Sequence, residues 1–363
     1  MTKEKKKINL SITNPRVFNA IKTFISLLIA LVVTFIVLVF ISDDPVTGFK
    51  TILFGPLEKA RYLGIVIEKT VPYAFAGLCC GLLFKMGFFN LGAEGIYIMS
   101  GVACTAMALV EMSSNILHPI ICIAIAAVVG GVLMVIPAFL KAKYGANEMV
   151  ISLMLNSIYL GISNFIIRNT MATTTRSNFY YSQDFLPSAK IGYLIEKYHI
   201  SACFILLLVV TLLIHLMLKK TKLGYAIRIT GTNPRFAEYS GINSFKLSMT
   251  VNFLAGVLAG IGSGSVLLTQ YAFYQWNNSP GIGFSGSLMA MLGGNNPFSI
   301  LISSFFIQYL EEGTTILYRF DKAVPSEIVA IVEGVMVLLI SSQYFLRGLR
   351  EKKLLKEGLE NDK

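Results

Sequence analysis

Long apolar runs separated by short polar segments form the main pattern of this chain. The first run, Phe24 to Ile41, spans 18 residues without a charged side chain. A soluble helix of that length would need a polar outer face, whereas a helix in a bilayer does not. A membrane β-barrel would show alternating segments of about ten residues, and the chain lacks that alternation. The pattern therefore predicts an all-α polytopic membrane protein.

About ten apolar segments can be marked as transmembrane or re-entrant helices. They lie near residues 22–41, 70–84, 96–110, 119–140, 149–167, 201–218, 249–268, 284–292, 298–318 and 326–346. The eighth segment is too short to cross a bilayer alone. Together with the glycine-rich approach to the third segment, it predicts re-entrant or broken helices, which must be buried in protein or line a cavity.

Charge is scarce, and its distribution predicts the orientation. Of the 363 residues, 55% are hydrophobic and 14% are charged, against about a quarter charged in soluble domains. The net charge of +11 comes from basic residues that cluster between and outside the apolar runs. This indicates membrane topology rather than a nucleic-acid partner. If the N-terminus is inside, 21 of the 31 Lys and Arg residues are cytoplasmic, so both termini are expected in the cytoplasm.

The same pattern divides the chain into segments. Residues 1–21 are expected to form a cytoplasmic N-terminal segment, 22–346 the transmembrane domain, and 347–363 a cytoplasmic basic tail. The first run ends at Ser42-Asp43-Asp44-Pro45 without a small-residue cleavage pattern, so we interpret it as an uncleaved span. Residues 168–200 are expected to form an extracellular loop. Four aromatic residues near the outer end of the seventh segment suggest an interfacial belt: Tyr271, Phe273, Tyr274 and Trp276.

Enzymatic and metal-binding patterns are missing from the sequence. The five cysteines lie in apolar stretches without a CxxC motif, which favours free thiols among helices. The three histidines have no metal-ligand spacing, and no Gly-x-Ser-x-Gly motif occurs. No Gly-Lys dipeptide occurs either, which excludes a phosphate-binding P-loop. We therefore predict that the chain is not an enzyme, that it does not hydrolyse ATP, and that it does not bind a metal or cofactor.

Two apolar segments carry polar stripes at helical spacing. The stripe in 149–167 consists of Ser152, Asn156, Tyr159 and Ser163, and the stripe in 298–318 of Gln308, Glu312 and Thr315. Because lipid offers no hydrogen-bond partners, each stripe must face protein or water. The stripes either line a solute path or hold helices together.

Glu333 lies at the centre of the last apolar segment, where a carboxylate costs about 2.5–3.5 kcal/mol to insert. A proton relay is one interpretation. No basic residue falls within the predicted spans to pair with it, so an interhelical hydrogen bond is the alternative that we favour.

Glycines at four-residue spacing indicate faces where helix backbones approach closely. Gly256, Gly260 and Gly264 form one such face, and Gly77 and Gly81 form another. A weak internal repeat is also visible, since the stretch 90–95 before the third segment resembles the stretch 279–284 before the eighth.

The cytoplasmic loop 219–248 is too long and patterned to be a simple connector. Residues 225–229 favour a helix, Gly-Thr-Asn-Pro at 231–234 favours a turn, and a second short helix is expected to end at Gly241. Two small helices on the cytoplasmic face would present a shaped surface to a soluble partner.

This loop resembles the coupling loop of permease subunits of ATP-binding cassette (ABC) importers. The general pattern is Glu-Ala-Ala, three residues, then Gly; Ala237 and Gly241 match it, whereas Arg235 and Phe236 depart from it. Three further stretches narrow the resemblance: Gly87 to Gly95 (GFFNLGAEG), Gly145 to Asn156 (GANEMVISLMLN) and Leu292 to Pro297 (LGGNNP). Together they resemble the branched-chain amino acid, sugar and nucleoside permease superfamily, and its nucleoside branch in particular, over about residues 60–345.

The resemblance implies a permease in the bacterial cytoplasmic membrane that works with other subunits. It implies a cytoplasmic ABC ATPase, a second related permease in a heterodimer, and an extracytoplasmic substrate-binding lipoprotein. The residues assigned to ATPase coupling are Gly224, Arg228, Gly231, Asn233, Pro234, Ala237, Gly241 and Ile242. The residues assigned to the substrate pathway are Asn90, Glu94, Ser152, Asn156, Tyr159, Gln308 and Glu333. A Gln often follows the Glu-Gly pair in that family; here Ile96 follows, which puts a substrate contact at that position in doubt.

Three interpretations of the function remain open. A nucleoside importer is favoured by the resemblance, while a sugar or branched-chain amino acid importer stays possible because the residues do not separate a nucleobase from a hexose. A secondary transporter that uses Glu312 and Glu333 for proton or ion coupling is the main rival. An intramembrane enzyme lacks the residues it would need.

Overall fold

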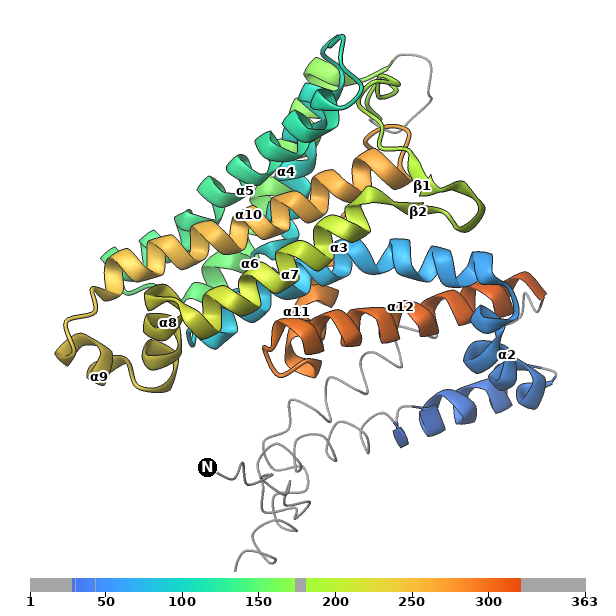
Figure 1. Cartoon of the computed structure of the whole chain (residues 1–363), viewed down its shortest axis with the longest axis horizontal. Coiled ribbons are helices and arrows are strands. Elements are labelled where there is room, and N and C mark those ends of the chain that lie inside the picture. The colour runs from blue at the N-terminus through green and yellow to red at the C-terminus, as the bar shows by residue number, and fades with distance from the viewer. Residues whose placement is uncertain (1–27, 30, 43, 174–180, 321–363) are drawn as a thin grey trace, which may run out of the picture. The chain divides into compact units, whose positions relative to one another are not determined.

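The computed structural model describes residues 28–29, 31–42, 44–173 and 181–320. These residues are mostly helical (Figure 1). Glu333, the tail 347–363, the N-terminal segment 1–21 and the apolar segment 326–346 lie outside them, so the predictions made there stay predictions. The described residues divide into two compact units: those up to residue 55 together with 313–320, and those of 56–312.

In the described chain the elements follow one another with short connections. The helices that precede the large polar loop are Leu31–Ile41, α2 (Pro45–Glu58), α3 (Ala60–Lys85), α4 (Ala93–Ala108), α5 (Leu117–Tyr144) and α6 (Glu148–Ile166), which continues as the π-helix η1 (Ile167–Met171). The loop contains β1 (Tyr193–Ile195), the short 3₁₀ helix η2 (Glu196–Tyr198) and β2 (Ile200–Ser201). The later helices are α7 (Ala202–Lys220), α8 (Lys222–Thr232), α9 (Pro234–Tyr239), α10 (Ser244–Gln270), α11 (Ile282–Leu292) and α12 (Pro297–Phe320).

Within the described residues, five helices are long and apolar enough to cross a membrane: Ala60–Lys85, Leu117–Tyr144, Glu148–Met171, Ala202–Lys220 and Ser244–Gln270. Three shorter apolar helices are Leu31–Ile41, Ala93–Ala108 and Ile282–Leu292. The second to ninth predicted segments thus each coincide with a helix, and the eighth is short, as expected. The count of ten and the side on which the termini lie stay predictions.

The unit of residues 56–312 has two central helices and a lipid-facing periphery. The most apolar windows of α3 and α10 are 72% and 78% buried, against 28% for those of α6 and α7. Helix α10 packs against α3, α4 and α5, while α11 packs against α3 (Figure 1). Since α6 and α7 expose apolar side chains to the surroundings, their outer faces suit contact with lipid.

Polar side chains that accept hydrogen bonds from backbone N–H groups determine where many of these helices begin. Asn147, Ser201, Thr221, Asn233 and Asn243 each accept a bond from a backbone N–H in the first turn of α6, α7, α8, α9 and α10 respectively. In the other unit, Gly313 packs against the backbone of Ile52, and Gly48 lies beside Leu317.

Two sequence predictions need correction. Helix α3 begins at Ala60 and not near residue 70, so Glu68 and Lys69 lie within it. The interfacial aromatic belt is also wrong for two of its members, because Tyr274 is fully buried and Trp276 is 5% exposed. Their rings pack on each other with centroids 5.5 Å apart, inside the protein. The five cysteines are free and buried, as predicted.

Candidate functional site

The polar stripe of α6 faces protein, one of the two surroundings that the sequence allows. Apart from Glu148, the buried residues of α6 are its four members, Ser152, Asn156, Tyr159 and Ser163. Asn156 accepts a bond from the backbone N–H of Gly95 (2.9 Å) and donates to the carbonyl of Leu91 (3.0 Å). The hydroxyl of Ser152 accepts a bond from the N–H of Leu91 (3.1 Å). The stripe therefore holds the backbone of the chain that enters α4.

The C-terminal half of the stripe, formed by Tyr159 and Ser163, bonds to other elements. Tyr159 donates to the carbonyl of Leu133 in α5 (3.3 Å), and the hydroxyls of Ser163 and Tyr274 lie 2.7 Å apart. All four members thus have protein partners. Their assignment to a substrate pathway stays a prediction.

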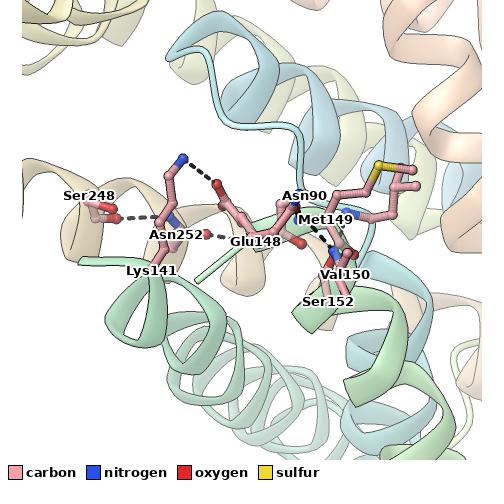
Figure 2. A network of polar contacts seen from close by, with 10 residues as sticks. Asn90, Lys141, Glu148, Met149, Val150, Ser152, Ser248 and Asn252 are labelled. Carbon is pink, nitrogen blue, oxygen red and sulfur yellow. Dashed lines mark hydrogen bonds and ion pairs between the residues drawn. The ribbon is translucent and has the colours of Figure 1, made fainter. Parts of the chain in front are cut away.

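Asn90 connects the same entry segment to α10. Its side chain is fully buried, accepts a bond from the N–H of Gly92 (2.7 Å) and donates to Asn252 (3.3 Å). Asn252 in turn donates to the carbonyl of Ser248 (3.0 Å). Figure 2 shows this network beside the ion pair of Lys141 and Glu148, whose charged atoms lie 2.8 Å apart. Asn252 is a member that the sequence reasoning missed, although an amide inside an apolar helix marks a buried contact.

Glu94 lies in the first turn of α4 and is 1% exposed. Its carboxylate accepts bonds from the N–H groups of Gly281 (2.7 Å), Gly283 (2.7 Å) and Phe284 (3.3 Å), and from the hydroxyl of Ser279. A negative charge at a helix N-terminus is favourable, and these N–H groups would otherwise lack acceptors. Glu94 therefore caps α11, and the two stretches that predicted an internal repeat meet at its carboxylate.

The polar stripe of α12 is also turned inward. Gln308 and Glu312 are 0% and 1% exposed, while Thr315 is partly exposed. Glu312 accepts from the ammonium of Lys69 at 2.9 Å, with Lys69 29% exposed. The expectation that the spans contain no basic residue is therefore wrong, because α3 starts earlier than predicted and includes Lys69. Both polar atoms of the Gln308 amide lack a hydrogen-bond partner within the described ranges.

Replacing Lys69 with methionine is expected to destabilise the protein, because the buried carboxyl group of Glu312 would lose its cationic partner. We expect a cost of about 2 kcal/mol, below the range for fully buried pairs because Lys69 is partly exposed. The measurement is thermal unfolding of the purified protein, with Lys59→Met as the control for an exposed lysine. The double variant Lys69→Met/Glu312→Gln should recover part of the loss. Wild-type stability of Lys69→Met would contradict the assignment.

The predicted coupling loop forms two short helices, α8 and α9. Arg228 of α8 donates to the carbonyl of Leu218 at the end of α7 (2.7 Å), and Gly231 packs on the carbonyl of Lys85 at the end of α3. Asn233 caps α9, which begins at Pro234. Thus α8 is fixed to the ends of two long helices.

The end of α9 turns sharply. Gly241 has a φ of +79°, which disfavours other residues, and the N–H of Ile242 bonds to the carbonyl of Ala237 (3.0 Å). Gly224 and Ala237 are buried, whereas Phe236 and Tyr239 are 53% and 91% exposed. We call α8 and α9 together the knob; its aromatic side chains, with Tyr225 of α8 at 53%, are exposed.

The glycine face of α10 packs against α5, as predicted. A β-carbon on Gly256 would overlap the carbonyl oxygen of Gly130, and one on Gly260 would overlap that of Ala126. Gly264 lies beside Ile123, where a β-carbon would come within 3.2 Å. The backbones of the two helices therefore touch along this face.

Among the residues that the structure describes, no group of three or more His, Cys, Asp or Glu side chains could hold a metal ion. The arrangement consists of buried polar contacts that position backbone, together with an exposed knob.

Comparison with protein families gives a match over most of the chain. The model described as "Branched-chain amino acid transport system / permease component" covers residues 62–341. No solved structure matches.

Similar curated proteins are transport permeases. The guanosine ABC transporter permease protein NupP of Bacillus subtilis is 26% identical over 86% of this chain and 90% of its own length. The nucleoside ABC transporter permease protein NupB of Lactococcus lactis is 26% identical over 85% and 87%. The glucose ABC transporter permease protein TsgB13 of Haloferax volcanii is 28% identical over 89% and 87%. Bacillus subtilis and Lactococcus lactis each have a second, less similar relative: NupQ and NupC respectively, both 22% identical to this chain.

Proposed function

The chain belongs to the family of permease components of branched-chain amino acid transport systems, and from this premise we propose that the solute it carries is a nucleoside. It is a multi-pass membrane protein and the transport subunit of an ABC importer, not an enzyme. ATP hydrolysis takes place in a separate subunit. The observation that carries the choice of solute is that NupP and NupB, which align with at least 85% of the chain, are named for guanosine and nucleosides. A sugar is the second candidate, favoured by the glucose permease TsgB13.

The knob is the part of this chain that receives the ATPase. Its three exposed aromatic side chains, Tyr225, Phe236 and Tyr239, are of the type that contributes most to protein interfaces. Because Gly231 packs on the end of α3 and Arg228 bonds to the end of α7, a displacement of the knob moves both helices. Helix α3 packs in turn against α10 and α11. Closure of the ATPase would thereby shift the equilibrium of the permease from one conformation to another.

The partners follow from the same premise. An ATPase and a substrate-binding protein serve permeases of this family. A second permease completes the translocation pathway, since relatives in two bacteria occur as two permeases named for the same solute, NupP with NupQ and NupB with NupC. We place the solute path beside Asn90, Glu94, the α6 stripe and Gln308, whose polar side chains are buried in the apolar unit and, apart from Gln308, bonded to other groups of the protein.

Replacing Gly241 with aspartate is expected to abolish uptake while leaving the protein in the membrane. The new side chain would force strain at a φ of +79° and place a negative charge on the knob, but it would meet no atom within 4 Å. Uptake of labelled guanosine in cells measures the effect. Gly145→Asp is the control. Gly145 also has a positive φ, +67°, and a β-carbon there would meet no atom within 4 Å, but it lies outside the loop 219–248. Normal uptake by Gly241→Asp would contradict the coupling role.

Binding of the ATPase can be tested without disturbing the fold. Tyr239→Ala removes a side chain that is 91% exposed, and Tyr144→Ala removes one that is 67% exposed but lies outside the knob. We expect co-purification of the ATPase to fall about tenfold for the first variant, as for an interface aromatic residue, and to stay unchanged for the second. Equal recovery from both variants would show that the ATPase binds elsewhere.

A further inference from the structure

A groove lies between the first turns of α5 and α7, at the end of the helices away from the knob. It has a volume of about 360 Å³ and its walls are mainly aliphatic. The residues that line it include Ile116, Ile120 and Ile123 from α5 and its approach, and Leu206 from α7. Asn115 and Lys190 are the polar lining residues, and none of the lining residues is acidic. The volume lies within the range of small-ligand sites.

The groove combines a long apolar wall with a cationic end. Ile120 and Ile123 lie within the first two turns of α5, and Leu206 lies one turn into α7, so the apolar wall extends about 6 Å or more along the helix axes. Asn115 and Lys190 precede the helices and are exposed. Both helices also begin here, and their N-terminal ends add positive potential. An apolar chain that carries a negative headgroup matches this arrangement.

The walls of the groove are held in place by buried polar contacts. His118, which is fully buried in the first turn of α5, bonds to the carbonyl of Met107 through Nε2 (3.0 Å). A carbonyl only accepts, so Nε2 carries a proton, and in the neutral ring Nδ1 accepts from the hydroxyl of Ser188 (2.9 Å). The N–H of Ile191 bonds to the carbonyl of Leu268 (3.0 Å). The backbone on both sides of Lys190 is therefore fixed.

The other wall is fixed through α3. The carboxylate of Glu68 accepts bonds from both the N–H (2.9 Å) and the hydroxyl (2.8 Å) of Ser201, the residue that caps α7. Glu68 is 5% exposed, so this contact holds the start of α7 firmly against α3. The groove is thus preformed, and a ligand would not have to order it.

We propose that this groove binds one anionic phospholipid of the outer leaflet, with an acyl chain along Ile120, Ile123 and Leu206 and its phosphate at Lys190. The leaflet follows from the proposed function, which places the knob in the cytoplasm: α7 runs from the groove to α8, and its 19 residues span about 28 Å, close to the hydrocarbon thickness. The exposed outer faces of Ile116 and Ile120, 75% and 57% exposed, open the groove sideways to lipid.

The experiment is native mass spectrometry of the full permease assembly, purified in mild detergent and supplied with phosphatidylglycerol or phosphatidylcholine. Lys190→Glu is expected to reduce retained phosphatidylglycerol by about fivefold or more, the effect of one basic residue on an anionic lipid. The control Lys197→Glu makes the same charge change on η2, outside the groove, and should retain lipid as the wild type does. Ile120→Trp should fill the groove and displace the lipid while Lys190 remains.

Three outcomes would overturn the proposal. Equal retention by Lys190→Glu and Lys197→Glu would indicate only unspecific annular lipid. Equal retention of phosphatidylglycerol and phosphatidylcholine by the wild type would show that the charge of the lipid headgroup does not contribute to binding. Efficient cross-linking of Ile120→Cys to the second permease would show a protein interface. Because lipid retention is measured without transport, failure here leaves the proposed solute and ATPase coupling untouched.

Discussion

Replacing Glu94 with alanine is expected to abolish solute uptake and to lower the stability of the permease. The carboxylate holds the N-terminal N–H groups of α11 and the hydroxyl of Ser279 at a buried site. Removing it leaves the buried N–H of Gly283 and three partly buried donors without their acceptor. Because a buried unsatisfied donor costs about 1–3 kcal/mol and partly buried donors cost less, we expect a total loss of about 3 kcal/mol. Without the cap, α11 loses its fixed position against α4.

Two variants separate this effect from a general loss of a glutamate. Glu94→Gln keeps the shape but offers only one acceptor oxygen and no charge, so it should lie between alanine and wild type in both measurements. Glu111→Ala removes an exposed glutamate beyond α4 and should have no effect. The measurements are guanosine uptake in cells and thermal unfolding of the purified protein. An uptake rate and an unfolding temperature like those of the wild type for Glu94→Ala would refute the role of the cap.

The second large effect is expected for Gly256→Ala in α10. The added β-carbon would overlap the backbone oxygen of Gly130, and backbone cannot move aside as a flexible side chain can. Helices α5 and α10 must then separate along their shared face, at a cost of about 3 kcal/mol or more. Protein abundance in the membrane and unfolding temperature should both fall.

Gly161→Ala provides the matched control for this substitution. Gly161 lies in α6, and a β-carbon there would meet no atom within 4 Å. Alanine should stabilise that helix slightly, by about 0.5–1 kcal/mol, because glycine is a poor helix former. If both variants behave alike, close packing of α5 on α10 is not what the glycine face provides.

Much of the helical framework could be predicted from hydropathy, because a bilayer requires apolar runs of fixed length. The inward direction of Ser152, Asn156, Tyr159 and Ser163 was also predictable, since their spacing puts them on one face and lipid offers them no partners. The glycine face of α10 followed from spacing in the same way.

Partners distant in sequence could not be predicted. Lys69 and Glu68 looked like polar residues outside a span because their charges lower local hydropathy, yet Glu312 and Ser201 satisfy them inside the protein. The capping of α11 by Glu94 joins segments 187 residues apart, which no local pattern reveals. The burial of Trp276 likewise depends on α4, since Gly101 makes room beside its ring.

The ion pair also bears on the rival interpretation of a secondary transporter. Glu312 was one of its two coupling carboxylates, and in the structure it is paired with Lys69. Glu333, the other, lies outside the described residues. Transport driven by a gradient would need no ATPase and would tolerate changes in the knob.

Reconstitution separates the two accounts most directly. The permease, its second permease and the ATPase are placed in proteoliposomes with the substrate-binding protein outside and ATP inside. If the chain is an ABC nucleoside permease, labelled guanosine accumulates only with ATP. The accumulation then continues when the proton and sodium gradients are collapsed, and excess glucose does not reduce it. Accumulation without ATP that disappears with the gradients would contradict it.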